Sequence, residues 1–189
     1  MSTTPLTLSF AGQQPPIALP QVPGTRGPVG VDMRGLNQSG FCSYDPGFAN
    51  TAGCQSAISW IDTENSVLLH RGYPVDQLAR QCDFLEVAYI MLNGDAPDEA
   101  SYQTFRETIT RHTLVHEQIA RMCSGFRRDS HPMALMCALV GALAAFYHDV
   151  LDVENPEHRA LAATRLLSKM PTIAAMSYKY TIEQPAAYP

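Results

Sequence analysis

The most apolar stretch of the chain is PMALMCALVGALAAFY, residues 132–147. The proline comes directly after Ser130-His131, a pattern typical of a helix start, so the stretch predicts one long helix. This helix is shorter than the roughly 20 apolar residues that a bilayer-spanning helix needs. A helix that is apolar nearly all round is buried inside a large protein or at a subunit interface. We therefore expect other elements to cover it.

Helical patterns flank this stretch on both sides. Asn93-Gly94 is a typical helix stop, and Asn155 is a typical helix cap because its side chain can accept a backbone hydrogen bond. Proline lacks the amide hydrogen that a helix interior needs, so Pro171 predicts a break after Lys169-Met170, with a further helix to about Tyr180. The other expected helices cover about residues 83–93, 98–110 and 115–126.

The first 75 residues are rich in proline and glycine and contain short alternating runs such as residues 6–10. The clearest strand pair is 57–61 with 66–70, joined by the polar loop 62–65. We therefore predict a β-rich amino-terminal portion over 1–75, followed over 76–189 by the first helices of a larger helical domain. The fold class is mainly α and incomplete.

Composition excludes several classes of protein. Eighteen acidic against thirteen basic residues give a net charge of −5, which disfavours binding to nucleic acid or to an anionic membrane. The start of the chain has no export signal, and a cytoplasmic location is expected. The five cysteines are odd in number and widely spaced, which predicts buried free thiols, with neither a disulfide framework nor a cysteine zinc site.

Two short motifs have a chemical and a structural interpretation. His112 and His116 would share one helix face and resemble a zinc pair, but no third ligand lies at an obvious spacing, so ordinary helix-end contacts are favoured and no metal is expected. Arg127-Arg128 stands before a helix start, where it could hold a phosphate or carboxylate or, as we prefer, tie the loop to a neighbouring subunit by ion pairs.

The remaining charged residues give weaker signals. Arg165 and Lys169 share a helix face, which by spacing alone indicates a solvated surface. His148-Asp149 lacks a neighbouring nucleophile and is weak evidence for a general base. Phosphate-loop, dinucleotide and serine-hydrolase motifs are absent. The residues by themselves therefore predict no complete active site.

Ordered segments across the chain nevertheless resemble one family, citrate synthase, and within it the longer, hexamer-forming type of Gram-negative bacteria. The resemblance runs from about residue 31 to 189. The matching segments are 45–48, 68–78, 89–94, 127–133 and 166–172. Since each segment is short, the resemblance depends on their order and spacing together.

The resemblance implies a mainly helical, two-domain enzyme that works as a dimer or a homohexamer. Such an enzyme condenses oxaloacetate with acetyl-CoA and water to give citrate and CoA, using two histidines and an aspartate and no cofactor. In the family these residues belong to segments that would follow Pro189, so no catalytic residue is assigned here. We expect this chain alone to be an amino-terminal fragment without activity.

The resemblance also implies one regulatory site, because NADH inhibits the hexameric type allosterically near a subunit interface. Leu114 stands where that type usually has methionine, a volume-conserving exchange. Two guanidiniums, an ammonium and an imidazole suit a pyrophosphate, and a tyrosine ring suits stacking. The matching positions are Arg111, His112, Thr113, Leu114, Tyr147, Arg165 and Lys169.

Two alternatives remain open at this point. The chain is a regulatory or assembly module that keeps an NADH-responsive, subunit-interface surface, or it belongs to 2-methylcitrate synthase, a related condensing enzyme. The longer β-containing start and the match at residues 111–113 favour citrate synthase over that relative.

Overall fold

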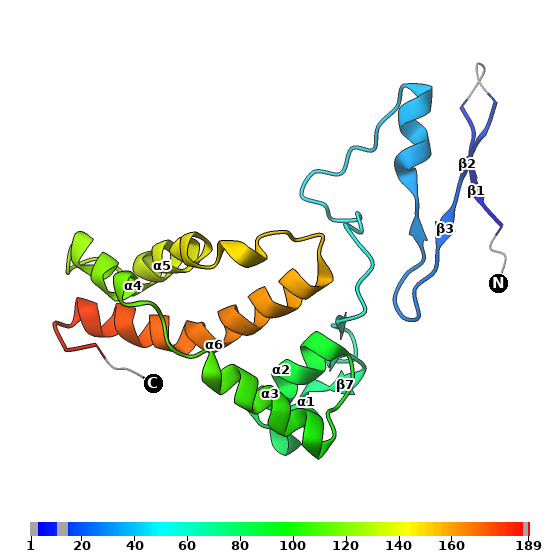
Figure 1. Cartoon of the computed structure of the whole chain (residues 1–189). Helices are drawn as coiled ribbons and strands as arrows, with labels where there is room; N and C mark the ends of the chain where they lie inside the picture. Colours follow the sequence, from blue (N-terminus) through cyan, green and yellow to red (C-terminus); the bar gives the residue numbers. More distant parts are fainter. Residues whose placement is uncertain (1–3, 11–14, 187–188) are drawn as a thin grey trace. The chain divides into compact units, whose positions relative to one another are not determined.

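The computed structural model describes residues 4–10, 15–186 and 189. It has two compact units, which meet in the sequence between Asp83 and Phe84. The predicted mainly helical class is confirmed: the strands are few and short, and they lie in the first unit (Figure 1). The domain boundary expected at residue 75 stays a prediction.

The first unit begins with two antiparallel strand pairs. Strand β1 (Leu6–Leu8) pairs with β2 (Ile17–Leu19), and β3 (Gln21–Val22) pairs with β4 (Gly30–Val31). The short 3₁₀ helix η1 (Met33–Ser39) packs against β2 and buries Leu36 beside that strand.

The predicted hairpin is confirmed in the same unit. Strands β5 (Ser59–Asp62) and β6 (Val67–His70) are antiparallel, with Asp62 opposite Val67. The Asp62 carboxylate accepts hydrogen bonds from Asn65, which closes the polar loop. Strand β7 (Tyr73–Pro74) and helix α1 (Val75–Gln81) follow, and α1 packs on β6 and β7 with Leu78 buried.

The second unit is helical, and its caps explain its boundaries. His116, His131 and Asn155 each accept a backbone N–H at a helix start, and Gly94 ends the first helix with a positive φ of 98°. The elements are α2 (Phe84–Asn93), α3 (Glu99–Arg111), α4 (Glu117–Met122), η2 (Cys123–Gly125), α5 (Pro132–Phe146), η3 (His148–Val150) and α6 (Pro156–Thr181).

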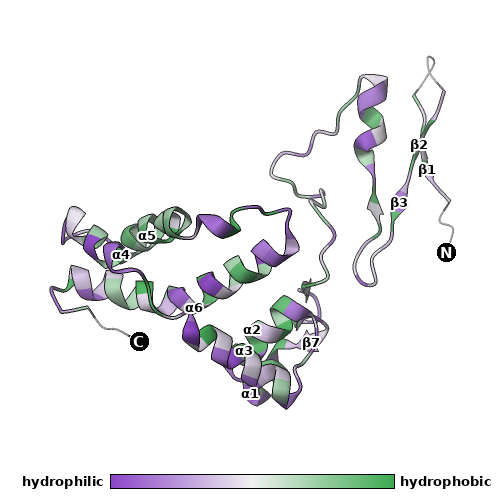
Figure 2. Ribbon diagram, in the orientation of Figure 1, coloured by the Kyte–Doolittle hydropathy of each residue, from purple (hydrophilic) through white to green (hydrophobic). Residues whose placement is uncertain are grey.

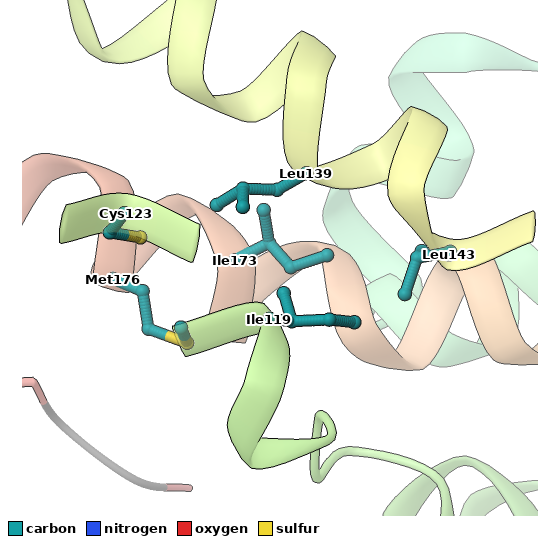
Figure 3. Close-up of a cluster of buried hydrophobic side chains, with 6 residues drawn as sticks. All are labelled: Ile119, Cys123, Leu139, Leu143, Ile173 and Met176. Carbon is teal, nitrogen blue, oxygen red and sulfur yellow. The ribbon is translucent and has the colours of Figure 1, made fainter. Parts of the chain in front are cut away.

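The core of this unit lies where α4, η2, α5 and α6 meet. Figure 3 shows Ile119, Leu139 and Ile173 pointing toward one another from three different helices. All three side chains are completely buried. Cys123, Leu143 and Met176 complete the cluster.

Helix α5, the stretch 132–147 without its last residue, is confirmed as helix but is covered on one face only. Leu135, Leu139 and Leu143 recur every fourth residue and are buried against the rest of the unit. Met133, Cys137 and Gly141 lie on the other side and are exposed. In Figure 2 the helix is coloured as apolar along its length. Among the described residues, no element covers this second face.

The predicted break at Pro171 is wrong. Helix α6 continues through the proline from Pro156 to Thr181. A proline inside a helix removes one backbone hydrogen bond, in this case to Leu167, and costs about 3 kcal/mol. The residues on either side offset that cost, because Lys169, Thr172 and Ile173 are buried in contacts that need an uninterrupted helix.

The prediction of buried thiols is also wrong for most of the cysteines. All five are free, but only Cys123 is buried, and Cys42, Cys54 and Cys137 are exposed. Burial raises the pKa of the Cys123 thiol above its usual value. No helix within the described part of the chain is long and apolar enough to span a membrane.

Replacing Ile173 tests whether this cluster stabilises the second unit. We expect Ile173→Ala to lower the free energy of unfolding by about 2 to 5 kcal/mol, because the cavity would lie between Ile119 and Leu139. The measurement is urea unfolding followed by helical circular dichroism. Leu166→Ala, on the exposed side of the same helix, is the control and should change the free energy of unfolding by about 0.5 kcal/mol or less. Equal losses from the two variants would contradict the stabilising role of the cluster.

Candidate functional site

The linker between α3 and α4 is held by side chains of α6. The carbonyl oxygens of His112, Thr113 and Leu114 all accept hydrogen bonds from that helix. Thr172 donates to Thr113 at 3.0 Å, and the Lys169 ammonium donates to the other two carbonyls. Each of these hydrogen bonds ties a main-chain carbonyl of the linker to α6, so this face of α6 determines where the linker lies.

Lys169 is the centre of this arrangement. Its side chain is almost fully enclosed, and its ammonium lies 2.7 Å from the His112 oxygen and 2.6 Å from the Leu114 oxygen. The ring of Tyr147 is the third neighbour, with its centroid 4.9 Å from the ammonium. Two charge-assisted hydrogen bonds and a cation–π contact compensate the loss of hydration. The solvated surface that spacing alone suggested is therefore wrong for Lys169.

Arg165, one turn earlier on α6, lies over the same tyrosine ring at 4.8 Å. Its guanidinium donates two parallel hydrogen bonds, of 2.9 and 3.0 Å, to the two carboxylate oxygens of Asp149. These bonds hold the pKa of Asp149 below its usual value and raise the pKa of Arg165. Asp149 lies in η3, so this pair joins the end of α5 to α6.

Six of the seven residues that the resemblance pointed to therefore adjoin one another around α6: His112, Thr113, Leu114, Tyr147, Arg165 and Lys169. Arg111 differs, because its exposed guanidinium bonds to Glu107 within α3, at 3.1 Å. The first three residues contribute main-chain carbonyls to these contacts. That NADH binds here stays a prediction.

The two other motifs take up structural contacts. His112 ends α3 and its ring lies 2.8 Å from the Thr108 carbonyl, whereas His116 begins α4. The helix-end interpretation of this pair is thus confirmed, and the two rings do not share a helix. Among the described residues, no three possible ligands are grouped as a metal site requires.

The arginine pair also makes contacts within the chain. Arg127 bonds to Asp129, and Arg128 lies over the ring of Tyr180, so this loop is tied to α6 of its own chain.

Sequence reasoning missed Asp149, Ser168 and Thr172 as members of this site. Ser168 and Thr172 flank Lys169 on α6 and are spaced one helical turn apart, and both are buried. Two small hydroxyl residues one helical turn apart beside a lysine are a signal that the sequence does contain, although it does not show their burial. The Asp149–Arg165 contact has no such signal, because it crosses a loop and matches no helical spacing.

A groove of about 740 Å³ lies elsewhere in the second unit, between α2, α3 and the first half of α6. Tyr89, Phe105 and Ala160 are among its lining residues. Its one lysine or arginine is Arg159, whose guanidinium already donates to the carbonyl oxygens of Val153 and Glu154. This groove offers shape but no group of titratable side chains.

A comparison with known protein families identifies the family of this chain. The family model described as the citrate synthase C-terminal domain matches residues 47–189, which is most of the chain. The chain belongs to the citrate synthase family. The match includes both the α6 contacts and the apolar helix α5.

Solved citrate synthases have the same fold. The enzyme from Pyrobaculum aerophilum is 26% identical, with a TM-score of 0.69 over 76% of this chain and 38% of its own. The Thermoplasma acidophilum enzyme is 22% identical with a TM-score of 0.71, over 78% of this chain and 38% of its own. The chain therefore spans about two fifths of the length of these citrate synthases.

Replacing Lys169 tests its role in holding the linker. We expect Lys169→Met to lower the free energy of unfolding by about 3 kcal/mol, because the linker carbonyls of His112 and Leu114 lose the buried ammonium that donates to both. The methionine keeps most of the apolar volume, so the loss would report the ammonium. Chemical unfolding followed by circular dichroism measures it. Lys179→Met, near the end of the same helix, is the control, and an equally small effect at both positions would contradict the role.

Proposed function

We propose that this chain is part of a citrate synthase, the enzyme that condenses oxaloacetate with acetyl-CoA and water to give citrate and CoA. The observation that carries this proposal is the family match over residues 47–189. The Thermoplasma acidophilum structure supports the substrates, because it is a ternary complex of citrate synthase with carboxymethyl coenzyme A and oxaloacetate.

The 189 residues alone are proposed to lack condensation activity. This reaction needs an acid–base pair held around two bound substrates. The chain spans only about two fifths of the citrate synthases that it matches. The His112, His116 and His131 rings are also committed to backbone groups at helix ends, which supports a structural role for them.

The direct assay measures CoA release from acetyl-CoA in the presence of oxaloacetate. We expect no release above background from the purified 189-residue chain. The complete product of the gene, expressed from its own start codon to its own stop codon, is the second arm and should release CoA at a rate typical of an enzyme, about 1 s⁻¹ or faster. Robust turnover by the short chain would refute the proposed inactivity, and no turnover by the complete product would refute the function.

A second proposed role is NADH-responsive regulation of a dimeric or hexameric enzyme. The observation that favours it is the cluster of Tyr147, Arg165 and Lys169, where an aromatic ring lies within 5 Å of two cationic groups. Of the two cations, Arg165 is the more accessible, since 16% of its side-chain surface is exposed. Lys169 is nearly enclosed and contacts the same tyrosine ring. We assign the pyrophosphate contact to Arg165.

Binding of NADH to the chain tests this assignment. We expect Arg165→Ala to raise the dissociation constant about tenfold, the effect of losing one charge-assisted contact. NADH fluorescence measures it. Arg106→Ala removes the same charge from the exposed side of α3 and should leave binding unchanged. Equal binding by the wild-type chain and Arg165→Ala would remove Arg165 from the site.

A further inference from the structure

Asp149 already holds the guanidinium to which an anionic ligand would bind. Its two carboxylate oxygens face Nη1 and Nη2 of Arg165 at 2.9 and 3.0 Å. A phosphate group binds to the same pair of donors in the same parallel geometry. Asp149 therefore takes the place of a ligand oxyanion in this structure.

The two partners differ in how freely they can move. The Arg165 side chain is only 16% exposed, and its guanidinium lies against the Tyr147 ring. The Asp149 side chain is 57% exposed. A carboxylate with that exposure regains hydration when it turns away, so the contact is inexpensive to break. Of the two side chains, Asp149 is therefore the one that can turn into solvent.

The neighbouring cations do not provide another contact for the anion. The Lys169 ammonium is nearly enclosed and donates to two main-chain carbonyls. The Arg111 guanidinium bonds to Glu107 within α3, outside the contacts that join Tyr147, Arg165 and Lys169. Arg128, farther along the chain, lies over the Tyr180 ring. An incoming anion at this cluster thus depends on Arg165, and it meets Asp149 there.

We propose that Asp149 is an internal competitor, which occupies Arg165 in the unliganded chain and must be displaced by the phosphate or pyrophosphate group of a ligand. This inference rests on the anion-binding role proposed above for Arg165. It adds a residue that lowers the affinity of the site for its ligand and so determines the ligand concentration at which the site responds. Two negative groups cannot share one guanidinium edge without repulsion.

Isothermal titration of the 189-residue chain with inorganic pyrophosphate at low salt tests the proposal, and NADH in parallel shows whether a dinucleotide behaves alike. We expect Asp149→Asn to bind pyrophosphate about fivefold more tightly than the wild-type chain, since the competing charge is gone. Asp149→Ser should show the same gain, and a melting curve verifies that both variants are folded. Binding by Asp149→Asn without detectable binding by the wild-type chain also supports the proposal.

Asp152→Asn is the matched control. Asp152 lies in the following loop and accepts from the backbone N–H of Glu154, so this variant removes an equal charge without touching Arg165. Its affinity should stay within twofold of the wild-type value. A gain as large as that of Asp149→Asn would mean a general charge effect and would overturn the proposal.

The remaining outcomes separate this inference from the role of Arg165. If the wild-type chain binds pyrophosphate, Arg165→Ala abolishes binding and Asp149→Asn binds no more tightly, then Arg165 is the anion contact and Asp149 is not its competitor. If none of the variants binds pyrophosphate or NADH, the anion site and the competition are both refuted.

Discussion

The second unit depends on one buried cation, the Lys169 ammonium. An ammonium without water must be surrounded by acceptors, and the carbonyls of His112 and Leu114 provide them at 2.7 and 2.6 Å. These carbonyls belong to the linker between α3 and α4. The position of the lysine therefore determines where α3 ends and α4 begins relative to α6. Exchanging the lysine would remove the charged donor from both linker carbonyls, and among the described residues only that of His112 has a second donor, the Ser168 hydroxyl.

That role of Lys169 also explains why α6 continues through Pro171. Two turns of the helix carry Ser168, Lys169, Thr172 and Ile173, all of them buried. The first three contact the linker and the last enters the core beside Ile119 and Leu139. A break at the proline would separate Ser168 and Lys169 from Thr172 and Ile173. Tertiary contacts thus outweigh the local preference of one residue.

Tyr147 and Arg165 belong to the same cluster as the buried cation, and Arg165 is its more accessible cation. The enclosed lysine holds the linker, whereas the partner of the arginine, Asp149, is largely exposed. The proposed anion site and its proposed competitor both rest on this difference in exposure between the two cations and their partners.

The sequence by itself determined the helical class, the hairpin at 59–70 and most helix boundaries, because these depend on nearby residues: Asn155 caps its own helix, Gly94 ends one, and Asp62 closes its own loop. It also indicated which residues of the candidate site would adjoin, through resemblance and not through spacing. The tertiary structure alone decided that Lys169 is buried, that Pro171 does not interrupt α6, that most thiols are exposed and that Arg165 is held by Asp149. Each of these depends on groups brought together from distant parts of the chain, and the free energy of such contacts has no local pattern in the sequence.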